Sequence, residues 1–192
     1  QIRATSPPTQ VTREVSTSLE GGTGLPFLEP PSDPAYIGRL DHFEIARVIG
    51  RGGMGIVLEA FDPHLQRSVA IKVLNPEYSK NTTARQRFCR EGRAAAAISH
   101  EHVVPMYQVA KESDSKVAYL VMQLIDGDTL EDRLISRQPL PPGEVARIGM
   151  QIAAGLSAAH SRGISRKNGF SAGHFAGSHV SKSSLSNGLS SL

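Results

Sequence analysis

A cluster of glycines stands between two segments whose apolar residues alternate with polar ones. The segments are 43–49 and 56–61, and the cluster has glycine at positions 50, 52, 53 and 55. Alternation of this kind predicts strands, so the pattern indicates a strand, a glycine-rich turn and a second strand. Glycine lets a backbone approach a phosphate closely and donate N–H groups to it. The cluster therefore predicts a phosphate-binding hairpin, and a glycine-rich hairpin without a ligand is the alternative.

The second chemical feature is a lysine inside an apolar strand. Lys72 ends the run Val69-Ala70-Ile71, and an ammonium group there needs a partner to offset the loss of water. Dinucleotide-binding folds also use glycine turns, but there a helix follows the turn and an acid comes about 20 residues later. Here a strand follows, and the later residue is basic. The pattern favours a glycine-rich lid and a lysine that both contact phosphates.

A carboxylate is expected to pair with this lysine. Glu91 is the only acid between Glu77 and Glu101, and it stands in a segment that we predict to be helical. An ion pair with Lys72 is one interpretation. A surface Glu91 that pairs with Arg87 or Arg90 is the other, and it would contribute only a few tenths of a kcal/mol.

Five strands and three helices are predicted to position these residues. The strands are expected at 43–49, 56–61, 68–74, 103–109 and 118–124. A helix capped by Thr82 or Thr83 should reach about Ile98, and a short helix should cover Thr129–Ser136. A long helix should begin at Pro141-Pro142 and end at Gly163. Its apolar face is marked by Val145, Ile148, Ile152, Leu156 and Ala159. The fold class is therefore α+β.

In this order, the motifs resemble those of bacterial serine/threonine protein kinases, above all the planctomycete-type group. The resemblance runs from residue 37 to about 163, or about two-thirds of the chain. It implies an N-lobe to about 124 with a five-stranded antiparallel sheet and one helix. A hinge at 123–127 and an incomplete C-lobe at 128–163, containing its first long helix, would follow.

The resemblance also implies an ATP site. Lys72 would contact the α- and β-phosphates and pair with Glu91, Met122 would stand behind the adenine, and the hinge backbone would hydrogen-bond to it. The residues implied for ATP binding are Ile49, Gly50, Gly52, Gly55, Val57, Ala70, Lys72, Glu91, Met122, Gln123 and Ile125. Mg²⁺ is expected for the family.

The resemblance ends where the family has its catalytic loop. The family needs His-Arg-Asp, then an Asn and Asp-Phe-Gly, for the base and the magnesium ligands. Here Gly163 leads into Ile164-Ser165-Arg166-Lys167, and no acid follows Glu144. No catalytic residue and no metal ligand is therefore assigned. The chain is predicted to be truncated and inactive as it stands.

Two further interpretations concern neighbouring features. The alternative to an incomplete kinase is a non-catalytic, pseudokinase-like module that binds nucleotide or a partner protein. The pair His100 and His102 resembles a metal pair, but we interpret it as a turn after the helix. The apolar face at 145–159 predicts fraying or self-association, because nothing after Gly163 is apolar enough to cover it.

Composition limits the remaining possibilities. Residues 1–36 and 164–192 are rich in Ser and Gly, the first also in Pro and Thr, and predict a disordered leader and tail. A net charge of +3, from 21 basic and 18 acidic side chains, argues against nucleic acid. No apolar run approaches the roughly 18 residues of a membrane helix. A single cysteine, Cys89, fits a reducing compartment, so a cytoplasmic location is predicted. ATP and a protein substrate or partner are the expected partners.

Overall fold

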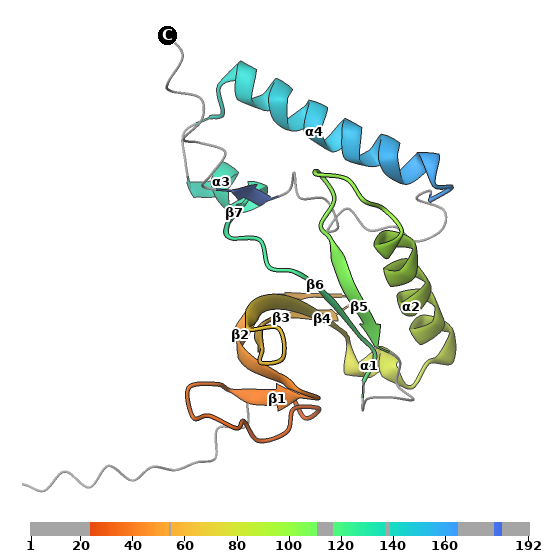
Figure 1. Ribbon diagram of the computed structural model, residues 1–192. Helices are drawn as coiled ribbons and strands as arrows, with labels where there is room; N and C mark the ends of the chain where they lie inside the picture. Colours follow the sequence, from red (N-terminus) through yellow and green to blue (C-terminus); the bar gives the residue numbers. More distant parts are fainter. Residues whose placement is uncertain (1–23, 54, 111–116, 137–138, 165–178, 182–192) are drawn as a thin grey trace, which may run out of the picture.

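The computed structural model describes residues 24–53, 55–110, 117–136, 139–164 and 179–181 (Figure 1). The described strands are β1 (Gly38–Leu40), β2 (Phe43–Gly52), β3 (Gly55–Asp62), β4 (Arg67–Leu74), β5 (Met106–Ala110), β6 (Tyr119–Gln123), β7 (Gly127–Thr129) and β8 (His179–Ser181). The helices are α1 (Pro76–Ser79), α2 (Thr82–Ala96), α3 (Leu130–Ser136) and α4 (Pro142–Ser161). Among the described residues, no helix has the length and apolar character needed to cross a membrane.

The first six strands form one antiparallel sheet in the order β1-β2-β3-β4-β6-β5. The α+β class and the five predicted strands are confirmed, and β1 adds a sixth. A strand of three residues is too short to show alternation, so the sequence pattern did not indicate it. β2 and β3 form the predicted hairpin, with Gly52 opposite Gly55 across the turn.

The two faces of the sheet have separate cores. On one face, Ile45, Leu58 and Ile71 are fully buried in a cluster that also contains Leu25 and Phe27. These last two residues belong to the predicted leader. The prediction of disorder is therefore wrong for residues 24–36, while residues 1–23 lie outside the described part. Two apolar side chains that fit the exposed face of a sheet can order a short segment without any periodic pattern.

Hydrogen bonds also hold this N-terminal segment to the sheet. Glu29 and Arg39 exchange two backbone hydrogen bonds of 2.8 Å, and their side chains form an ion pair of 2.9 Å. The backbone N–H of Ser32 donates to the buried Glu44 carboxylate. The segment thus satisfies polar groups at the edge of the sheet as well as covering its apolar face.

The second face of the sheet packs against α2, which runs beside β5 in Figure 1. Phe88 and Cys89 of α2 lie in one cluster with Leu120 and Met122 of β6. The predicted cap of this helix is wrong, because Asn81 precedes it and its side chain accepts a hydrogen bond from Ala84 N at 3.0 Å. Asparagine is at least as good an N-cap as threonine, and here it stands one residue earlier.

The segment after β6 contains α3 and α4. A nearly buried ion pair joins the two helices, with Arg133 Nη2 at 2.7 Å from Glu144 Oε1. The apolar face predicted for α4 is partly covered: Ile148 and Ala159 are buried, whereas Val145 is 53% exposed.

The predicted disordered tail also contains described residues. Ile164 is buried against Val103 and Ala159, and β8 pairs with β7. Ile164 therefore belongs to the folded part of the chain. The remaining residues of the predicted tail lie outside the described part.

Candidate nucleotide-binding site

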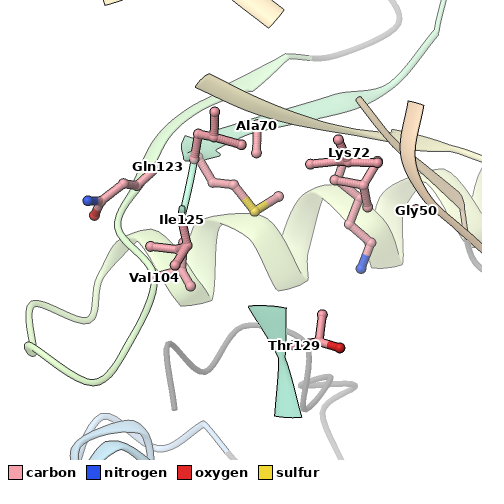
Figure 2. A pocket seen from close by; sticks show the side chains of 11 residues that line it. Gly50, Ala70, Lys72, Val104, Gln123, Ile125 and Thr129 are labelled. Atoms are coloured by element: carbon pink, nitrogen blue, oxygen red, sulfur yellow. The ribbon is translucent and has the colours of Figure 1, made fainter. Parts of the chain in front are cut away.

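A cavity of about 300 Å³ lies between the glycine hairpin and the segment that follows β6. Its lining residues come from β2, β3, β4 and β6, from the segment before β5, and from β7: Ile49, Gly50, Val57, Ala70, Lys72, Val104, Met122, Gln123, Leu124, Ile125 and Thr129. Figure 2 shows these side chains converging from several elements. The volume is at the lower end of the range for small-molecule sites.

Sheet register explains why residues distant in sequence meet here. Val57 lies opposite Lys72 on β3 and β4, and Ala70 lies opposite Met122 on β4 and β6. Antiparallel neighbours on one face have Cβ atoms about 5 Å apart, so these pairs form one continuous surface. The cavity therefore has a floor of small and apolar side chains with a single lysine at one side.

Eight of the eleven residues predicted to bind nucleotide line this cavity: Ile49, Gly50, Val57, Ala70, Lys72, Met122, Gln123 and Ile125. Gly52, Gly55 and Glu91 are not among the lining residues. A side chain at Gly55 would collide with the Val73 carbonyl oxygen, so this glycine is required by close packing of β3 on β4. Around Gly52 no atom lies within 4 Å of an added Cβ.

Three lining residues were not predicted. Val104 is buried between α2 and β5, Leu124 follows β6, and Thr129 ends β7. Leu124 stands between two predicted hinge residues and could have been included on that ground. No sequence signal distinguished Val104 or Thr129. Each lies at the cavity only because of how the folded chain runs, which a local sequence pattern does not show.

The hinge segment lines the cavity at Gln123, Leu124 and Ile125. Gln123 N donates to Pro105 O at 3.0 Å, and the Gln123 side chain is exposed. In Figure 2 this side chain extends away from Lys72.

Lys72 supplies the positive charge of the cavity. Its side chain is largely desolvated, and burial lowers the pKa of Lys72 below its ordinary value, while the Glu91 carboxylate raises it. Desolvation is the stronger of the two effects, so the ammonium would gain from an anionic ligand.

Glu91 is buried on α2 and bonded to an arginine of the same helix. Arg87 Nε donates to Glu91 Oε1 at 2.8 Å. Within the part of the chain that the structure describes, no ion pair of 4.0 Å or less joins Lys72 to Glu91. Of the pairings considered for Glu91, the one with Arg87 is formed here, but Glu91 is buried and not the surface residue of that interpretation. The carboxylate acts on Lys72 only through its field.

The lining of the cavity suits the binding of a small molecule, but it offers few groups for bond-breaking chemistry. Among the described residues that line it, most are apolar, Lys72 carries the one formal charge, and none is Asp, Glu or His. These features suit a flat apolar ring joined to an anionic group. Mg²⁺ prefers carboxylate oxygens, so the lining residues do not fit that ion.

Comparison with known proteins points to one family. The model of the protein kinase domain matches residues 43–167. The serine/threonine-protein kinase PknD of Mycobacterium tuberculosis is 36% identical over 126 residues, which cover 66% of this chain and 19% of that protein. PrkC of Bacillus subtilis is 37% identical over 122 residues, covering 64% and 18%.

Solved structures agree with this result. The crystal structure of a cysteine-to-alanine mutant of the Mycobacterium tuberculosis PknI kinase domain matches with a TM-score of 0.57 and 29% identity, covering 65% of this chain and 51% of that one. The chain thus spans about a fifth of the length of PknD and PrkC and about half of the solved domain.

Proposed function

The chain belongs to the protein kinase domain family, and we propose that its described part is the ATP-binding portion of a serine/threonine protein kinase. One observation carries the proposal: the cavity joins a glycine hairpin, a desolvated lysine and a hinge segment in a single lining. The adenine ring would lie between Val57 and Ala70 on one side and the hinge on the other. Lys72 would contact the phosphates.

The charge of Lys72 should make the cavity prefer ligands that carry phosphates. An ammonium that has lost much of its water gains more from a phosphate than an exposed one does, because the local dielectric is lower. A ligand with the ring but without the phosphates should therefore bind much more weakly. ATP should bind more tightly than adenosine by a margin that depends on Lys72.

Phosphate transfer is a separate matter from binding. Residues 145–192 contain no Asp or Glu, so the printed chain has no side chain for the aspartate base or the aspartate ligand of Mg²⁺. We propose that the chain of residues 1–192 binds ATP and does not transfer phosphate to protein by the known route. The names of the relatives describe serine/threonine kinases. We propose phosphate transfer to Ser or Thr only for a kinase that has the aspartate base and the aspartate ligand of Mg²⁺.

The test is titration of the chain with ATP, followed by calorimetry, for the wild type and two lysine variants. Lys72→Met should abolish measurable binding. Lys80→Met removes an exposed lysine after α1 and should leave binding unchanged. Equal affinity of wild type and Lys72→Met would contradict the phosphate contact. Phosphate incorporation into a protein substrate, above that of Lys72→Met, would contradict the absence of transfer.

The exposed apolar residues of α3 and α4 favour a second candidate property, self-association. Leu134, Ile135, Val145 and Met150 are between 53% and 79% exposed, and association of two chains can bury such apolar side chains. Sedimentation of the chain over a range of concentrations tests this. A monomer at every concentration would contradict it.

A further inference from the structure

Two turns at one end of the β2–β3 hairpin bring two histidines and an aspartate together. His42 lies in the turn before β2, Asp62 is the last residue of β3, and His64 follows in the turn to β4. The strands are antiparallel with Glu44 opposite Phe61, so the start of β2 lies beside the end of β3. The eight residues of β3, at about 3.3 Å each, place this cluster roughly 25 Å from the glycine turn.

The donor atoms of the three side chains are close to one another. One ring nitrogen of each histidine and one carboxylate oxygen of Asp62 all lie within 4.8 Å of one another. His42 Nε2 is 3.8 Å from Asp62 Oδ1. The two imidazole rings stack with centroids 4.4 Å apart.

The carboxylate is held in place by its own turn. Asp62 is only 4% exposed, and its Oδ1 accepts hydrogen bonds from His64 N at 3.0 Å and Leu65 N at 3.1 Å. Outer hydrogen bonds of this kind orient a ligating carboxylate and are typical of metal sites. The Asp62 carboxylate is thus held in a fixed position beside the two imidazole rings.

We propose that His42, Asp62 and His64 bind one Zn²⁺ ion. Two imidazole nitrogens and one carboxylate oxygen form a ligand set that suits Zn²⁺, and three protein ligands leave a fourth tetrahedral position for water. Imidazole lone pairs lie in the plane of the ring, so one of the two parallel rings must turn to share an ion. His64 is exposed and can turn.

The bound ion would join parts of the lobe that the nucleotide does not touch. It links the β1–β2 turn to the β3–β4 turn. The first turn is also fixed from the other side, where Tyr119 OH donates to Asp41 Oδ2 at 2.5 Å. An ion that binds only the folded chain stabilises it in proportion to its affinity. Bound Zn²⁺ would therefore stabilise the lobe, and its binding does not require ATP.

The experiment uses the full chain without an affinity tag, freed of metal by a chelator and kept free of nucleotide. Zn²⁺ is titrated by calorimetry, and Co²⁺ is added separately to record the visible absorption of a nitrogen- and oxygen-ligated ion. The variants are His64→Ala and Asp62→Asn. Asparagine keeps the oxygen that accepts the two backbone hydrogen bonds, so the turn should survive while the charge is lost.

His102→Ala is the matched control. Among the described residues, His100 and His102 form a second close histidine pair, with ring centroids 5.4 Å apart, and they lie outside the proposed site. Wild type and His102→Ala should each bind one Zn²⁺ and unfold at a higher temperature when it is present. In His64→Ala and Asp62→Asn, affinity should fall about 10-fold or more.

Three results of the Zn²⁺ titrations would overturn the proposal. These are no Zn²⁺ binding by the wild type, equal binding by wild type and His64→Ala, or loss of binding in His102→Ala. A Co²⁺ spectrum that is the same in wild type and His64→Ala would also contradict it. That readout does not depend on how far a substitution changes stability.

Discussion

Replacement of Gly92 by alanine tests how closely α2 packs on the sheet. A Cβ at this position would overlap Leu120 Cδ2, and it would lie 3.2 Å from Leu120 Cδ1 and 3.3 Å from Val109 Cγ2. Leu120 is 1% exposed and cannot swing into water. Alanine gains about 1 kcal/mol of helix propensity, but overpacking of a core costs about 1–3 kcal/mol. We expect Gly92→Ala to lower the free energy of unfolding by about 1 kcal/mol.

Urea unfolding of two alanine variants separates packing from propensity. Gly149 stands in the middle of α4, is exposed, and has no atom within 4 Å of an added Cβ. Gly149→Ala should therefore stabilise the chain by about 1 kcal/mol. In a Leu120→Val background the crowding is reduced, so Gly92→Ala should lose its cost there. The resulting coupling energy should be about 1 kcal/mol or more.

The same substitution also has a consequence for the cavity. An outward shift of α2 would carry Glu91 away from Lys72 and reduce the one interaction that raises the lysine pKa. ATP affinity should then fall along with stability. If Gly92→Ala stabilises the chain as much as Gly149→Ala does, α2 does not approach β6 as closely as described, and the reasoning fails.

Two further predictions follow from charge and burial. Glu91→Gln removes the anion that raises the pKa of Lys72, so this pKa should fall further below 10.5. As pH rises, ATP affinity should then begin to decline at a lower pH in the variant than in the wild type. Calorimetry across a pH series measures this, and the same pH profile in both proteins would mean that the charge of Glu91 does not affect Lys72. Unfolding gives a second measure. Because the unfolded chain keeps the higher lysine pKa, the free energy of unfolding should rise with pH between the two pKa values, over a wider range in the variant. Phe27→Ala should cost about 3 kcal/mol, since Phe27 is buried against the sheet; a loss near zero in urea unfolding would mean that residues 24–36 add nothing to the core.

The hairpin and the lysine strand were predictable because local pattern alone specifies them. Alternation in β2 and β3, the glycine turn and the apolar run before Lys72 are each visible within about ten residues. Once those strands pair in register, Val57, Ala70 and Lys72 must share one face. This is why most of the candidate site could be assigned before the fold was known.

The remaining features depend on contacts between distant segments. Leu25 and Phe27 carry no periodic signal, and they become core residues only because the sheet offers them an apolar face. The partner of Glu91 was left open because Arg87 and Lys72 both lay within plausible reach. His42 and Asp62 are 20 positions apart in the sequence. Only the register of β2 and β3 places them together.

The two faces of the sheet explain how binding and transfer can be separated in this family. One face is sealed by residues 24–36 and takes no part in the cavity. The other carries Lys72 and packs on α2, whose Glu91 acts on that lysine. In the binding mode that we propose, all groups that would hold the adenine ring and the phosphates therefore come from this lobe and the hinge. The base and the metal ligands belong to segments that follow α4 in the family's order. A lobe of this kind can hold ATP in position without any group that moves its phosphate, because positioning and transfer are carried by different parts of the chain.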